Sequence, residues 1–166
     1  MEYGNETILY ELFESSDVSG RIVDFDPFIL LPDGEKFNFQ RGYVWNLKDK
    51  QSLINSIYEG SHCGGIVCRV DLDYRLSVID GKQRANALHD FVLNKFKDNN
   101  GYYFGDLSNI SQGKFLTLQS FSFNIMNHTA TDLDVIKQFL KVNVAGVKVD
   151  KSHLNKVAEA MKKLES

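Results

Sequence analysis

The chain has 166 residues, of which 43% are hydrophobic and 25% are charged, which suits a single globular domain with one real hydrophobic core. Its formal net charge of −3 argues against a general electrostatic grip on nucleic acid, although a local basic patch is compatible with that charge. No apolar stretch comes near the roughly 20 residues that cross a bilayer, and no signal peptide is recognised, so we expect a cytoplasmic protein with no membrane partner.

The first part of the chain predicts one helix followed by short extended segments. Apolar residues at helical spacing predict a helix over Glu6 to Phe13. Extended segments follow at Gly20 to Asp26 and at Phe28 to Leu31. Pro32-Asp33-Gly34 then predicts a turn that returns the chain into a strand at Phe37 to Arg41.

The strand predicted at Phe37 to Arg41 alternates aromatic with polar side chains and ends in Gln40 and Arg41. It runs into Gly42-Tyr43-Val44-Trp45, which contains the only tryptophan of the chain. We expect Trp45 to pack in the core beneath any site that Gln40 and Arg41 form.

A helix is predicted from Leu47 to about Glu59, with a stop at Gly60. Asn46 has the character of an N-cap, and Asp49 stands where the carboxylate of a capping box would be. The apolar residues expected to face the core are Leu47, Leu53, Ile54, Ile57 and Tyr58.

Two strands, Gly65 to Val70 and Tyr74 to Ile79, are joined by the polar turn Asp71-Leu72-Asp73, and so short a link predicts an antiparallel hairpin. Cys63 and Cys68 flank and enter the first strand at a spacing that does not suit a disulfide. The histidines are scattered and no Cys-x-x-Cys pair occurs, so we do not expect a structural zinc ion.

The most informative segment follows the second strand of this hairpin. The strand ends in Asp80, and Gly81 then opens a helix whose first turn carries Lys82, Gln83 and Arg84. Cations in a first turn oppose the helix macrodipole, and a sequence tolerates them more readily if an anion binds there. The alternative interpretation is a plain strand-to-helix turn with solvated charges.

The helix after Gly81 is predicted to turn Ala85, Leu88, Phe91, Val92 and Phe96 inward. An irregular loop follows at Asp98 to Gly105. Its aromatic run Tyr102-Tyr103-Phe104 either stacks on bases or packs against the domain, and packing is the favoured alternative.

The remaining part predicts a half-buried strand at Phe121 to Met126 and two helices. The first helix is capped by Thr131 and stops at Gly146, with Asn143 near its end. The last helix, Lys151 to Leu164, carries an apolar stripe, which is interpreted as domain packing in preference to a partner-docking face.

A Gln-Arg pair thus ends one predicted strand, and another Gln-Arg pair begins the helix after a second strand. If the two strands end on the same side of a compact α+β domain, two guanidinium groups and two amides converge on one anionic ligand. We therefore expect Arg41 and Arg84 to share a site.

The segments Gln40-Arg41-Gly42-Tyr43-Val44-Trp45, Asp80-Gly81-Lys82-Gln83-Arg84 and Phe139-Leu140-Lys141-Val142-Asn143 together resemble the N-terminal domain of GmrSD-type modification-dependent restriction enzymes. The resemblance spans about Phe37 to Leu154 and implies a ParB/sulfiredoxin-like α+β fold, with a small mixed sheet flanked by helices and the C-terminal helices packed on it. In the DGQQR-type motif of that family, Lys82 stands where the family usually has another glutamine directly before Gln83.

The resemblance implies binding and hydrolysis of a nucleoside triphosphate (NTP) with Mg²⁺, in a phage-defence or restriction setting. Asp80, Gln83 and Arg84 are the expected catalytic residues, and Asp80 is also the expected magnesium ligand. The residues expected to contact the nucleotide are Gln40, Arg41, Gly81, Lys82 and Asn143.

Two of these assignments keep an alternative. Asp80 could instead cap the following helix, and Asn143 could merely end its own helix.

The chain ends before the His-Asn-His-like nuclease domain of the restriction enzymes, so the resemblance does not imply DNA cutting, and we expect any effector to be a separate protein chain. Two other function classes remain. One is a ParB-like DNA-binding or nuclease protein, which the net charge does not support. The other is a nucleotide-responsive adaptor that does not hydrolyse, which Lys82 favours if that position handles water.

Overall fold

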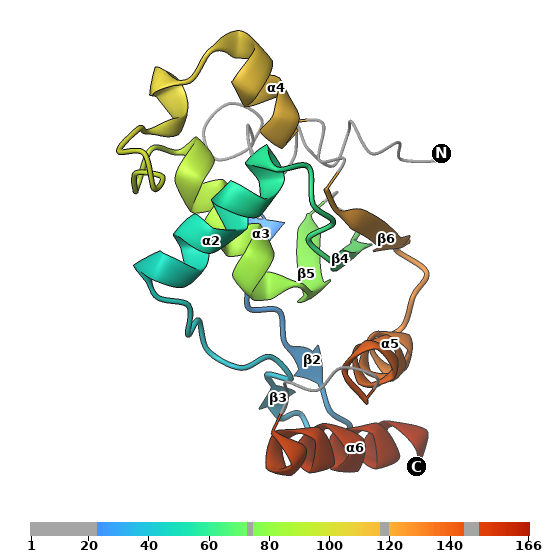
Figure 1. Cartoon of the computed structure of the whole chain (residues 1–166). Coiled ribbons are helices and arrows are strands. Elements are labelled where there is room, and N and C mark those ends of the chain that lie inside the picture. Colours follow the sequence, from blue (N-terminus) through green and yellow to red (C-terminus); the bar gives the residue numbers. More distant parts are fainter. Residues whose placement is uncertain (1–22, 73–74, 117–119, 145–149) are drawn as a thin grey trace.

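The computed structural model describes residues 23–72, 75–116, 120–144 and 150–166 (Figure 1). Within them the chain forms an α+β fold with a mixed sheet and flanking helices, which confirms the expected fold class. The helix predicted at Glu6 to Phe13 and the stop predicted at Gly146 lie outside the described residues. None of the described helices is long and apolar enough to cross a membrane.

The central sheet has the strand order β1-β5-β4-β6. Its hairpin of β4 (Gly65–Val70) and β5 (Leu76–Asp80) is antiparallel, as the short link predicts. β1 (Val23–Asp24) runs parallel to β5, and β6 (Ser122–Met126) runs parallel to β4. The carboxyl end of β5 therefore lies at the same end of the sheet as the amino end of β4.

Alternating side chains of the hairpin enter two separate cores, because successive residues of a strand point to opposite faces. One core lies under α2 (Leu47–Tyr58), α3 (Lys82–Val92) and α4 (Asn109–Leu116). The other lies under α5 (Asp132–Val144) and α6 (Lys151–Glu165). Figure 1 shows the two sets of helices on opposite sides of the sheet.

Buried residues divide between these cores as the pleat requires. The first core includes Ile54, Ile66, Cys68, Val78, Leu88, Phe91 and Phe115. The second includes Ile29, Phe39, Val67, Ile79, Val135, Ile136 and Val157. The apolar stripe of α6 thus packs inside the domain, as favoured from the sequence.

The turn predicted at Pro32-Asp33-Gly34 does join an antiparallel pair, β2 (Ile29–Leu30) and β3 (Lys36–Phe37). The strand predicted at Phe37 to Arg41 was wrong in extent, because pairing stops at Phe37. Asn38 Oδ1 accepts a hydrogen bond from the backbone N–H of Gln40 at 2.9 Å, which closes a local turn in place of an extended conformation.

The Asn46–Asp49 capping box that starts α2 is confirmed in both directions. The expected burial of Leu47 was wrong, since its side chain is 53% exposed. Figure 1 shows the start of α2 at the outer edge of the molecule.

After α3, Phe96 and Phe104 are buried while Tyr102 and Tyr103 stay exposed. The packing interpretation of the aromatic run therefore holds for Phe104. The one-turn helix η1 (Phe104–Asp106) and α4 are elements that the sequence pattern did not predict.

Candidate functional site

The turn from β5 into α3 requires glycine for the protein's own packing. Gly81 is the N-cap of α3 and has a φ of +83°, which strains any residue with a side chain. A Cβ here would lie 2.8 Å from the backbone oxygen of Gly65 and 3.1 Å from Ile66. No side-chain hydrogen bond caps α3, so the alternative role of Asp80 as a helix cap has no support.

Arg84 reaches back from the first turn of α3 across the start of β4. Its Nη2 donates to the backbone oxygen of Gly65 and lies 3.6 Å from Asp80 Oδ2. The guanidinium also lies over Gly64, where a Cβ would come within 3.5 Å of its Cζ. The Nε is buried without a hydrogen-bond partner, while 28% of the side chain remains exposed. Arg84 is thus oriented and still accessible.

Asp80 lies between Arg84 and Asn143, and a quarter of its side chain is exposed. Asn143 Nδ2, in the last turn of α5, is 3.4 Å from Asp80 Oδ1 and donates to the backbone oxygen of Phe139 at 2.8 Å. Asn143 therefore does more than end its helix, because it brings α5 to the carboxylate at the end of β5.

Residues 40–45, hereafter the strap, cross the same end of the sheet. Gln40 Nε2 donates to the backbone oxygens of Val78 and Ile79, the latter at 3.2 Å. Lys82 Nζ donates to the backbone oxygen of Arg41 at 3.1 Å and forms an ion pair with Asp26. Lys82 is only 6% exposed, and its side chain connects α3 to the strap and to Asp26.

Gln83 makes the most extensive contacts with the strap. Its Oε1 accepts from the backbone N–H groups of Val44 at 3.0 Å and Trp45 at 3.2 Å. Its Nε2 donates to the backbone oxygen of Gly42 at 3.0 Å. Gln83 is 9% exposed, so its amide is committed to the main chain of the strap.

These contacts bring the two Gln-Arg motifs together, although they are about 40 residues apart. Asp80, Arg84 and Asn143 have side chains that meet at the end of β5. Gln40, Lys82 and Gln83 instead bond the strap to β5 and α3. Arg41 is an exposed residue of the strap, and its backbone oxygen accepts a hydrogen bond from Lys82.

Sequence reasoning missed several residues beside this cluster. Asp26 pairs with Lys82, but nothing in its spacing marks it. Partial burial raises the pKa of the Cys63 thiol, and the nearby charge of Arg84 opposes that shift. Burial, together with the charges of Asp90 and Asp49, raises the pKa of Tyr43 to about 12.

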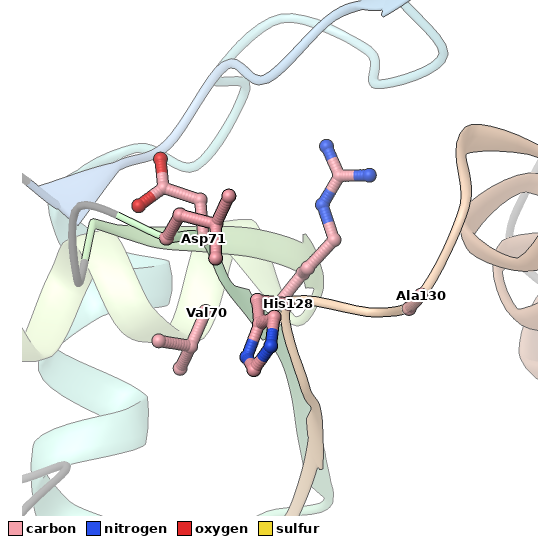
Figure 2. Close-up of a pocket in the computed structure, with 6 residues that line it drawn as sticks. Val70, Asp71, His128 and Ala130 are labelled. Carbon is pink, nitrogen blue, oxygen red and sulfur yellow. The ribbon is translucent and has the colours of Figure 1, made fainter.

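A pocket of about 290 Å³ lies at the other end of β4 (Figure 2). It is lined by Arg69, Val70, Asp71, Leu72, His128 and Ala130. Arg69 forms a 2.8 Å ion pair with Asp132, so its charge is compensated. The pocket contains none of the residues predicted from the motifs.

Among the described residues, no three His, Cys, Asp or Glu side chains gather in a way that could hold a metal ion. Any magnesium ion at Asp80 would therefore need further ligands from water and from a bound phosphate.

The chain was compared with known protein families, curated proteins and solved structures. The family described as GmrSD restriction endonuclease, N-terminal domain, matches residues 10–153. No curated protein and no solved structure shows a significant match to the chain.

Proposed function

The chain belongs to the family of the GmrSD restriction endonuclease N-terminal domain, and from that premise we propose that it binds and hydrolyses a nucleoside triphosphate in a restriction or phage-defence system. One observation carries the proposal. Lys82 and Gln83 bond the strap, which contains Arg41, to the first turn of α3, which contains Arg84. Two guanidinium groups from such neighbouring segments suit a polyphosphate.

Arg84 is the main phosphate ligand in this proposal. The guanidinium is held by Gly65 and Asp80, and part of it stays exposed toward solvent. The first turn of α3 has no side-chain cap, so its backbone N–H groups and the helix dipole favour an anion at the same place. Arg41 supplies a second cation from the strap.

In this proposal, Asp80 provides the single protein carboxylate that binds a magnesium ion. Mg²⁺ keeps several waters and is usually bound through one or two carboxylates plus substrate phosphates. The partly exposed carboxylate of Asp80, with a 3.4 Å contact to Asn143, leaves oxygen lone pairs for that purpose. The ion would neutralise charge on the β- and γ-phosphates.

The proposed reaction is the hydrolysis of the terminal phosphoanhydride. The oxygen of a water forms a bond to the γ-phosphorus, and the bond from that phosphorus to the β–γ bridging oxygen breaks. The electron pair leaves with the nucleoside diphosphate, and the water's proton passes to solvent. Asp80 orients the water, while Arg84 stabilises the charge that develops on the phosphoryl oxygens.

Lys82 does not weigh against hydrolysis. Its ammonium group is bonded to Asp26 and to the backbone of Arg41, so this position ties segments together and does not handle water. The adaptor alternative loses the argument that rested on this substitution. An effector on a separate chain remains part of the proposal.

The test is phosphate release by the full chain with ATP, GTP, CTP and UTP in the presence of Mg²⁺. We expect turnover with at least one nucleotide, and loss of it in Arg84→Ala but not in Arg75→Ala, whose exposed arginine lies at the far end of the β4–β5 hairpin. Binding without turnover would favour the adaptor. If the chain neither binds nor hydrolyses an NTP but retards DNA in a salt-sensitive gel-shift assay, the DNA-binding class would be favoured.

A further inference from the structure

We propose that Gln83 is a positioning residue, which locks the strap onto α3 and thereby places Arg41 at the phosphate site, and that it does not contact the nucleotide. The inference rests on the proposed function for its effect on turnover. Its structural part, the locking of the strap, can be measured without any nucleotide.

The hydrogen-bonding capacity of Gln83 is nearly used up by the protein. A glutamine amide has two acceptor lone pairs and two donor hydrogens. The two lone pairs accept hydrogen bonds from the backbone N–H groups of Val44 and Trp45, and one amide hydrogen is donated to the backbone oxygen of Gly42. A group committed in this way would have to release the strap before it could orient a water, and release would also free the residues next to Arg41.

The strap depends on side chains for its position, because residues 38–46 belong to no described helix or strand. It runs over the surface, and Val44 is 62% exposed. Gln40 fixes its beginning on β5, Lys82 fixes the backbone of Arg41, and Gln83 fixes three points beyond it. Arg41 thus lies between anchors on both sides.

The two roles of Gln83 predict different kinetics. A residue that places Arg41 affects phosphate binding in the ground state and the transition state alike, so its loss appears mainly in KM. A residue that orients the attacking water acts on the transition state alone, so its loss appears mainly in kcat.

The experiment uses Gln83→Leu, which keeps the apolar bulk and removes all three hydrogen bonds. Gln112→Leu is the matched control, because Gln112 Nε2 also donates to two backbone oxygens, those of Phe104 at 3.3 Å and Leu107 at 3.1 Å, but on α4. Arg41→Ala and the double variant with Gln83→Leu complete a double-mutant cycle.

Trp45 provides the readout that needs no nucleotide. It is the only tryptophan of the chain, it is part of the strap, and its backbone N–H is bonded to Gln83. We expect Gln83→Leu to increase acrylamide quenching of Trp45 fluorescence at a temperature where the variant is folded. Gln112→Leu should leave the quenching unchanged.

In turnover, Gln83→Leu should raise KM by about tenfold with kcat within about threefold, and adding Arg41→Ala should raise KM little further. A kcat loss with unchanged KM, or independent additive effects of the two substitutions, would overturn the proposal. If the wild type neither binds nor hydrolyses any NTP, the proposed function fails, and Trp45 quenching alone decides whether Gln83 locks the strap. Unchanged quenching in Gln83→Leu overturns that part too.

Discussion

Arg84 is held in place by β4 and still exposes part of its side chain. One guanidinium nitrogen is bonded to Gly65, another is buried without a partner, and the plane of the group lies over Gly64. A planar group with several fixed donors can serve both β4 and a phosphate, whereas an ammonium group cannot reproduce that geometry.

Arg84→Ala should therefore abolish NTP binding, and Arg84→Lys should restore little of it. The loss of one charge-assisted contact should cost about 2 kcal/mol or more. Isothermal titration calorimetry with the preferred NTP checks this, with Arg75→Ala as the control. Equal affinity of the wild type and Arg84→Ala would remove Arg84 from the site.

Asp80→Asn should keep NTP affinity within a few-fold and lose most of the hydrolysis. A carboxylate that acts on the transition state contributes little to ground-state binding, so its loss appears in turnover. The fold should survive, because α3 is not capped by a side chain.

Single-turnover phosphate release, with a melting curve alongside, measures both effects of Asp80→Asn. Asp33→Asn, at an exposed turn, is the control. Full hydrolysis by Asp80→Asn would leave Asp80 with only its contacts to Arg84 and Asn143.

Gly81→Ala should destabilise the fold by roughly 2 kcal/mol or more, because alanine is strained at positive φ and its Cβ would meet the backbone of β4. Urea unfolding gives the value. Gly113→Ala should instead stabilise the fold, because Gly113 lies in helix α4 and the added Cβ would meet only open space. An unchanged midpoint in Gly81→Ala would show that the turn can relax.

At the scale of elements, local chemistry explains which predictions succeeded. The boundaries of α2 and β4 follow from nearby residues. α2 begins at a reciprocal cap between Asn46 and Asp49, and β4 is a mostly apolar segment that ends before a polar turn. The end of β3 depends instead on competition between pairing and the Asn38 turn, which the alternating pattern did not reveal.

The Lys50–Asp90 ion pair joins α2 to α3 at 2.9 Å, and Asp90 is 14% exposed. Burial raises the pKa of Asp90, but hydrogen bonds and charges from Lys50 and Lys95 outweigh it and leave the pKa below 3.8. The stabilisation is therefore fully present above about pH 4 and is lost as the pH falls through the lower folded pKa.

Asp90→Asn should thus reduce the free energy of unfolding at pH 7 by about 1 kcal/mol, after solvent screening, and the difference from the wild type should shrink toward zero near pH 2. Denaturant unfolding across that pH range measures it. Asp150→Asn, which keeps an equally good N-cap on α6, should show no difference. If Asp90→Asn lowered the free energy of unfolding by the same amount at all pH values, the stabilisation would not come from the ionised carboxylate of Asp90.

At the scale of the whole molecule, the two-sided sheet determines where the site lies. α2 and α3 cover one face and α5 covers the other, so the carboxyl end of β5 is where the strap, α3 and α5 meet. His153 of α6 adds to this end, since its Nε2 lies 2.6 Å from the backbone oxygen of Phe39, just before the strap.

The sequence predicted this convergence from the two Gln-Arg motifs but could not predict how it is achieved. Motif residues with the same polar character divide into two groups in three dimensions. Asp80, Arg84 and Asn143 meet at the end of β5, whereas Gln40, Lys82 and Gln83 bond to the main chain. The bonds to the main chain join residues about 40 positions apart, and Asn143 is 63 positions from Asp80, so the local pattern contains no signal for this division.

The central claim is that both motifs form one phosphate site. A crystal structure with Mg²⁺ and a non-hydrolysable NTP analogue tests it most directly. We expect triphosphate density between Arg41 of the strap and Arg84 in the first turn of α3, with the metal on Asp80. Triphosphate density elsewhere, such as in the Arg69–His128 pocket at the other end of β4, or contacts with Arg84 but none with the strap, would contradict it.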